Sequence, residues 1–156
     1  ISRLGKRLAE NCGDREYSVV TNSIPTALEL SDSGLPDVQL LGGSVRPISQ
    51  AVVGSTALRT LALLRADVAF VGTNALSIGH GLSTPDAQEA AVKAAMVTNA
   101  RKVVVLCDST KLGNDYVVSF APLTDIDVVV TDAEAPSAFV DELRSHGIEV
   151  VLAQTQ

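Results

Sequence analysis

The chain has 156 residues, of which 46% are hydrophobic and 19% are charged, and its formal net charge is −6. This composition excludes intrinsic disorder, and the lack of any run of about 18 apolar residues excludes a membrane-spanning helix. At roughly 150 residues per domain, the length predicts one domain over residues 1–156 with a substantial hydrophobic core. The acidic charge argues against nucleic-acid binding by this chain alone.

The residues that usually hold metals or cofactors are sparse. Cys12 and Cys107 give neither a disulfide framework nor a CxxC spacing, and Cys107 lies in an apolar run, as expected of a reduced thiol in a cytoplasmic protein. His80 and His146 have no cysteine or carboxylate at ligand spacing, so no metal site is predicted. No Walker loop, nucleophile elbow or GxGxxG motif occurs, so no cofactor is predicted.

The first residues form an amphipathic pattern with no strand before it. Leu4 and Leu8 have the i, i+4 spacing of a helix, and the basic residues between them are unlike a signal peptide. Because the chain also lacks an initiator Met, we interpret it as a fragment of a longer protein.

Strands and helices alternate along the rest of the chain. One helix is expected from near Pro25 to Gly34, and another opens at Thr84, as its N-cap, and continues to about Ala100 after a glycine-bearing loop over 77–84. Gly147 is the expected C-cap of a helix over 136–146. A further helix is expected over 56–64, and strands over 17–20, 38–41, 67–71, 102–107, 117–120, 126–130 and 148–152.

The apolar runs are continuous rather than alternating, which indicates strands buried on both faces. Strands that alternate with helices predict an α/β fold with a mostly parallel sheet flanked by helices.

Polar or glycine residues follow five of the predicted strands. Ligands of open parallel sheets bind beyond the carboxyl ends of the strands, where glycines admit the ligand and small polar groups bond to it. Each cluster alone is also typical of ordinary turns, but five together favour a site at this edge. The clusters are Thr21-Asn22, Gly42-Gly43, Gly72-Thr73-Asn74, Asp108-Ser109-Thr110-Lys111 and Thr131-Asp132.

Glu89 and Lys93 are spaced i, i+4 in the helix that begins near Asp86. On spacing alone, they are best explained as a solvent-facing ion pair worth about 0.3–0.5 kcal/mol.

Seven short motifs follow one another along the chain: TNS, LLGGSVR, VVG, ADVAFVGTNALS, GLSTPDAQEAAVKAAM, VVVLCDSTKLG and TDIDVVVTD. In order and spacing, from about Leu4 to Leu152, they resemble the C-terminal sensor domain of DeoR-family bacterial transcriptional regulators. The resemblance implies a fold similar to ribose-5-phosphate isomerase, which is Rossmann-like, and a phosphorylated sugar as effector. It also implies a homo-oligomer and an N-terminal winged helix-turn-helix domain that binds operator DNA. That domain, and the D-x-G-T-T phosphate loop usual in the family, would precede Ile1.

The resemblance also implies which residues contact the effector. The DSTK turn matches the family's D-S-[ST]-K pattern, which makes Lys111 the expected partner of a phosphate or sugar oxygen. Asp108 would orient Lys111 or accept a sugar hydroxyl, and Glu89 and Lys93 would form the pocket wall. The full set of expected effector contacts is Asn22, Gly42, Gly43, Gly72, Thr73, Gly81, Glu89, Lys93, Asp108 and Lys111.

An active sugar-phosphate isomerase or deaminase is the alternative. Isomerisation needs a positioned base and acids, which the related isomerases supply from a G-A-D-E turn and from a Glu directly before a Lys. Here the turn reads Gly72-Thr73-Asn74-Ala75-Leu76, and Val92 precedes Lys93. The sequence therefore favours a sensor domain of a repressor of sugar metabolism over an enzyme. A purely structural domain would explain the fold but not the polar strand ends.

Overall fold

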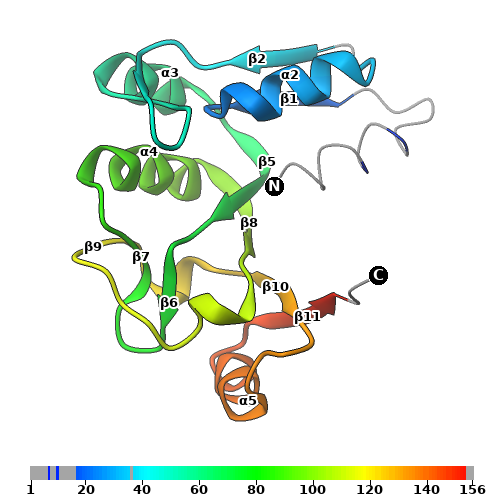
Figure 1. The fold of residues 1–156 in the computed structure, drawn as a ribbon, viewed down its shortest axis with the longest axis vertical. Helices are drawn as coiled ribbons and strands as arrows, with labels where there is room; N and C mark the ends of the chain where they lie inside the picture. Colours follow the sequence, from blue (N-terminus) through cyan, green and yellow to red (C-terminus); the bar gives the residue numbers. More distant parts are fainter. Residues whose placement is uncertain (1–6, 8–9, 11–16, 36, 154–156) are drawn as a thin grey trace. The chain divides into compact units, whose positions relative to one another are not determined.

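The computed structural model describes residues 7, 10, 17–35 and 37–153 (Figure 1). The chain forms two compact units, Ile1–Thr60 and Leu61–Gln156, and each is described by itself. The helix expected around Leu4 and Leu8 lies outside the described residues, and a single domain over 1–156 stays a prediction.

In the first unit, strand β1 (Ser18–Thr21) pairs in parallel with β2 (Asp37–Leu40). Helix α2 (Ile24–Asp32) connects the two strands, as the sequence predicts. Ser23 caps this helix because its hydroxyl accepts a hydrogen bond from the backbone N–H of Thr26 at 3.3 Å.

A short antiparallel hairpin follows β2 and was not expected from the sequence. Its strands, β3 (Ser44–Arg46) and β4 (Ala51–Val53), have three residues each, too few for hydrophobic periodicity to reveal them. Gly43 precedes the hairpin with a φ of 148°, and a Cβ there would lie 2.6 Å from the carbonyl oxygen of Val53. Helix α3 (Ser55–Leu63) agrees with the prediction to within one residue.

The second unit contains a four-stranded parallel sheet in the order β11-β10-β8-β5. Gly72, Leu106 and Val130 stand opposite one another on β5, β8 and β10, so these strands end at a common carboxyl edge. The sheet and its helices confirm the predicted α/β class. The elements are β5 (Ala66–Gly72), α4 (Ala87–Thr98), β8 (Ala100–Leu106), β10 (Val128–Asp132), α5 (Ser137–Ser145) and β11 (Glu149–Ala153).

A three-stranded antiparallel sheet lies in the same unit. The loop predicted over 77–84 is wrong: the chain forms a hairpin of β6 (Ala75–Ser77) and β7 (Gly81–Thr84), and β7 pairs with β9 (Val118–Ala121). Glycine and serine suggested a loop, but burial of Leu76 and Leu82 stabilises these short strands. Two 3₁₀ turns, η1 (Ser109–Lys111) and η2 (Leu123–Asp125), flank β9 along the chain.

The expected start of helix α4 is wrong by two residues. Thr84 belongs to β7, and the N-cap is Asp86, whose Oδ1 accepts a hydrogen bond from the N–H of Glu89 at 2.9 Å. A carboxylate competes well for this position because it also interacts favourably with the helix dipole. At the end of α5 the cap residue is His146, and the predicted terminator Gly147 follows it with a φ of 83°.

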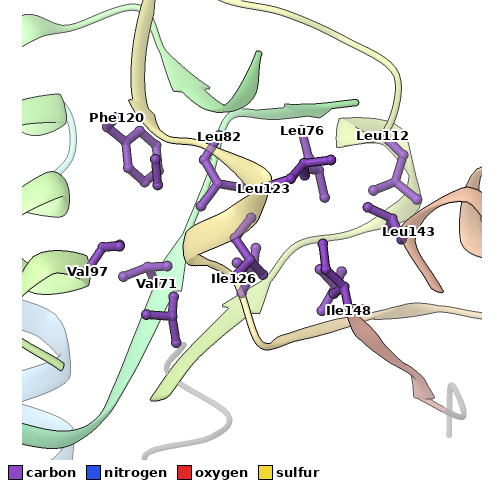
Figure 2. Close-up of a cluster of buried hydrophobic side chains, with 14 of the residues drawn as sticks. Val71, Leu76, Leu82, Val97, Leu112, Phe120, Leu123, Ile126, Leu143 and Ile148 are labelled. Atoms are coloured by element: carbon purple, nitrogen blue, oxygen red, sulfur yellow. The ribbon is translucent and has the colours of Figure 1, made fainter. Parts of the chain in front are cut away.

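One hydrophobic core joins both sheets of this unit to α4 and α5 (Figure 2). Val104 and Val105, neighbours on β8, are both buried, so this central strand is covered on both faces as predicted. The same prediction is wrong for the edge strands, since Phe70 on β5 and Val151 on β11 are 36% and 41% exposed. Labelled core residues include Val71, Leu76, Leu82, Val97, Leu112, Phe120, Leu123, Ile126, Leu143 and Ile148.

Within the described parts of the chain, no helix is long and apolar enough to cross a membrane.

Gly81 provides a test of the hairpin packing. Gly81 and Gly113 both have a left-handed φ, 70° and 77°, but only a Cβ at Gly81 would collide with Ala121 and Pro122. Gly81→Ala should therefore lower the free energy of unfolding by about 1–3 kcal/mol more than Gly113→Ala does. Urea unfolding of the two variants measures the difference, and equal losses would contradict the close approach of β7 to Ala121.

Candidate functional site

Three of the predicted effector contacts lie in the first unit, around β4. Asn22 follows β1, and its Nδ2 donates to the carbonyl oxygen of Val52 at 3.3 Å. Gly42 is exposed, and Gly43 allows the close approach of Val53. Asn22 and Gly43 therefore lie next to Val52 and Val53, two successive residues of β4, and both also have structural roles.

In the second unit, the turn after β5 is bonded to strand β7. Gly72 ends β5, and the hydroxyl of Thr73 lies within hydrogen-bonding distance of the carbonyl oxygens of Ala75 (2.7 Å) and Ser83 (3.1 Å). The next residue, Asn74, accepts a hydrogen bond at Oδ1 from the hydroxyl of Thr84 at 2.9 Å. Two successive side chains therefore hold this turn in place.

Asn74 and Thr84 were not among the expected contacts. Asn74 belongs to a predicted strand-end cluster, which was the available signal, whereas Thr84 reaches it only because residues 77–84 form a hairpin. Gly81 lies two residue pairs away from Ser83 in that hairpin, and its φ and packing explain why it is glycine.

Glu89 and Lys93 are not a solvent-facing pair. Glu89 is only 9% exposed, and the Lys93 ammonium lies 5.4 Å from the ring centroid of Phe120 on β9. Burial lowers the pKa of Lys93 below its usual value of 10.5, and the nearby Glu89 carboxylate opposes this effect. The contact between the amine and the aromatic face is a cation–π interaction, which partly compensates the lost hydration.

The first turn of α4, which carries Glu89, lies toward the carboxyl edge of the sheet. The carbonyl oxygen of Asn99, just past the helix, accepts a hydrogen bond from the N–H of Ala66, the first residue of β5. Since the helix ends at the amino edge of the sheet, its first turns lie toward the opposite edge. Glu89 therefore lies toward the same edge of the sheet as Thr73 and Asp108.

The turn after β8 is organised by two carboxylates. Asp108 accepts hydrogen bonds from the hydroxyl and the backbone N–H of Thr110, and these bonds lower its pKa. Asp132, at the end of β10, accepts from the N–H of Ser109 at 2.7 Å and from that of Glu134 at 3.0 Å, and the bond from Ser109 is the main reason that its pKa is lowered. Both carboxylates remain ionised at neutral pH.

An open hollow of about 300 Å³ lies at this turn, lined by Asp108, Ser109, Thr110, Asp132, Ala133 and Glu134. Three acidic side chains make it unfavourable for a phosphate but suitable for sugar hydroxyls, which can donate to carboxylates. Lys111 closes the 3₁₀ turn and is half-buried. Asp108 and Lys111 thus lie in one turn of the second unit, whereas Asn22, Gly42 and Gly43 are residues of the first unit.

Cys107 precedes this turn as a largely buried thiol. Burial, together with the charges of Asp108 and Asp132, raises its pKa to about 12, with Lys111 opposing the shift. Such a thiol is protonated and unreactive at neutral pH. Among the residues that the structure describes, no cluster of His, Cys, Asp and Glu could hold a metal ion.

Comparison with known proteins shows to which family the chain belongs. The family described as "DeoR C terminal sensor domain" matches residues 4–133. The chain belongs to this family. The DeoR resemblance of the sequence motifs is therefore confirmed.

Relatives of this sensor domain are transcriptional regulators. It is 41% identical over 132 residues to the HTH-type transcriptional regulator GlpR of Haloferax volcanii, covering 85% of this chain and 51% of the relative. It is 32% identical over 139 residues to the HTH-type transcriptional repressor GlcR of Bacillus subtilis, covering 89% and 54%. For the lactose phosphotransferase system repressor of Lactococcus lactis the identity is 34% over 128 residues, covering 82% and 50%. The chain spans about half the length of these relatives.

The lowered pKa of Lys93 predicts a specific pH dependence of stability. The unfolded chain keeps its proton on Lys93 up to about pH 10.5, while the folded chain releases it earlier. As the pH rises through the folded pKa, the unfolded state therefore binds more protons, and the DeoR sensor domain gains stability relative to Lys93→Met. Urea unfolding between pH 7 and 10 measures this gain, with Lys102→Met as the control for loss of a charge at an exposed lysine. A difference between wild type and Lys93→Met that is independent of pH would contradict the burial of Lys93.

Proposed function

We propose that this DeoR sensor domain binds a phosphorylated sugar at the carboxyl edge of its parallel sheet, and that binding changes the operator affinity of a helix-turn-helix domain in a longer regulator. The regulator is proposed to be a homo-oligomeric repressor of sugar metabolism. The observation that carries the proposal is a half-buried lysine, Lys93, next to a buried glutamate on α4. The N-cap of this helix follows two residues after Thr84, which is bonded to Asn74 in the turn after β5.

The charges near this edge suggest how the effector is oriented. The hollow at Asp108, Asp132 and Glu134 favours sugar hydroxyls as donors and disfavours a phosphate. We propose that Lys111 and Lys93 supply the positive charge for a phosphate or a sugar oxygen, and that Glu89 accepts a hydrogen bond from a sugar hydroxyl. Gly72 and Thr73 line the turn beyond β5, whereas effector contact by Asn22, Gly42, Gly43 and Gly81 stays a prediction.

We propose that the domain binds its ligand without catalysing a reaction of it. The turn after β5 carries no carboxylate. The side chain of Asn74 is an uncharged amide, hydrogen-bonded to Thr84, and Ala75 is fully buried. An isomerase needs a base within reach of the carbon-bound proton, and this turn does not supply one. The names of the relatives, all regulators or repressors, support the same proposal.

Calorimetry of the complete regulator with ribose 5-phosphate, glucose 6-phosphate, fructose 1-phosphate and fructose 6-phosphate tests the proposal. At least one should bind more tightly than its free sugar and than inorganic phosphate, and should change operator binding in a gel-shift titration. A regulator that binds free sugars equally well would contradict the phosphorylated class of effector. Failure of the bound ligand to alter operator affinity would contradict the sensing role.

Lys111 gives the sharpest single-residue prediction. If its ammonium contacts the bound sugar phosphate, Lys111→Ala should weaken effector binding by about 1.5–3 kcal/mol, or roughly ten- to hundredfold. Operator affinity without effector should stay nearly unchanged, and Lys111→Arg should restore binding incompletely because a planar guanidinium has a different shape. The exposed Lys102→Ala is the matched control. Equal calorimetric affinities of wild type and Lys111→Ala would remove Lys111 from the site.

The absence of isomerase activity is a separate expectation. Incubated with ribose 5-phosphate, the chain should form ketose no faster than a buffer blank, because the turn after β5 lacks the acids that isomerisation requires. A coupled spectrophotometric assay measures this rate. Turnover that is well above the blank and is lost in Lys111→Ala would overturn the sensor assignment in favour of an enzyme.

A further inference from the structure

Asn74 is held in one orientation by a buried partner. Thr84 is 0% exposed, and its hydroxyl donates to Oδ1 of Asn74 at 2.9 Å. A buried hydroxyl needs an acceptor for its hydrogen, and among the described residues Oδ1 is the one that Thr84 has. The oxygen of the Asn74 amide is therefore engaged, and its orientation is determined by strand β7.

The nitrogen of the same amide can still donate hydrogen bonds. Nδ2 of Asn74 makes no hydrogen bond with any residue that the structure describes, and it is not among the polar atoms buried from solvent. It carries two N–H groups and no charge, so its preferred partner is an acceptor oxygen. Asn74 is half-buried, which restricts what can approach it.

The backbone around Asn74 is also fixed. Thr73, the preceding residue, bonds to Ser83 of β7, while Ser83 in turn accepts a hydrogen bond from the N–H of Tyr116 at 2.9 Å. The turn after β5 is thus connected to β7 at two successive positions. A donor held in this way loses little conformational entropy on binding, which favours selective recognition.

The position of Asn74 connects this donor to the proposed effector site. It lies two residues beyond Gly72, whose partner Leu106 on β8 lies two residues before Asp108. Its partner Thr84 lies two residues before Asp86, the N-cap of α4. The amide therefore lies at the same edge of the sheet as the Asp108–Lys111 turn and the first turn of α4.

We propose that Nδ2 of Asn74 donates a hydrogen bond to an oxygen of the bound phosphorylated sugar, and that Thr84 is the positioning residue that orients the amide. The inference rests on the proposed function and adds a specificity-determining residue to it. The acceptor belongs either to the sugar or to its phosphate, and the charge of the residue at position 74 distinguishes the two. An aspartate still accepts a hydrogen from a sugar hydroxyl but repels a phosphate.

The experiment measures the affinity of the complete regulator, by calorimetry, for whichever of the four sugar phosphates named above binds wild type most tightly. Asn74→Ala should weaken binding roughly two- to tenfold, the effect of losing one neutral hydrogen bond. Asn74→Asp should weaken it much further if the acceptor is a phosphate oxygen, and less than Asn74→Ala does if it is a sugar hydroxyl. Asn99→Ala is the matched control, because Asn99 is also half-buried and hydrogen-bonded but lies at the amino edge of the sheet.

The role of Thr84 requires a double-variant test. Thr84→Val removes the hydroxyl, so it should weaken effector binding in the wild-type background and have no further effect in Asn74→Ala. Thermal unfolding of each variant separates loss of affinity from loss of fold. The NMR signals of the Asn74 side-chain amide, assigned with Asn74→Ala, should shift on addition of the sugar phosphate.

The outcomes separate the two levels of the proposal. Absence of binding by wild type to all four sugar phosphates contradicts the proposed function, and the inference with it. Binding by wild type with an unchanged affinity in Asn74→Ala and an unshifted amide signal overturns the inference alone. A folded Asn74→Ala with weakened binding, no comparable loss in Asn99→Ala and a shifted amide signal supports it.

Discussion

The register of the parallel sheet is the constraint on which the rest of the second unit depends. Gly72, Leu106 and Val130 stand opposite one another, so the turns that follow β5 and β8 begin at the same level as the last residues of β10. Residues that are 24 and 34 positions apart in the chain therefore meet at one edge. Burial of the successive valines of β8 and β10 stabilises these two central strands of the sheet.

The polar residues at the strand ends make hydrogen bonds that stabilise the fold. Asp132 accepts two backbone N–H groups, Asp108 caps the following 3₁₀ turn, and Thr73 bonds to β7. The carboxylates satisfy backbone N–H groups in the segments that follow the strands, and Thr73 connects the turn after β5 to a carbonyl oxygen of β7. The same bonds fix where the remaining polar atoms lie, so a site can be built from residues that are already rigid.

In contrast to these hydrogen bonds, the burial of a charged group on α4 costs stability. Burial of Lys93, which packs against Phe120, removes much of its hydration and lowers the pKa of its amine. Glu89 and the aromatic ring compensate only in part. Groups with perturbed pKa values of this kind are enriched at functional sites, which is consistent with the proposed sensing role.

The sequence by itself determined the fold class, most strand and helix positions, and the family. Long apolar runs and glycine or proline boundaries are local signals, and the strand over 102–107 and the helix near Pro25 were predicted from them. It also determined that polar residues gather at strand ends. Only the tertiary structure decided that Thr84 lies in a hairpin rather than at a helix cap, that Glu89 is buried rather than in solvent, and that Asn74 has its oxygen engaged. These properties depend on partners distant in the sequence, and such pairings arise from packing, for which local residue patterns contain no signal.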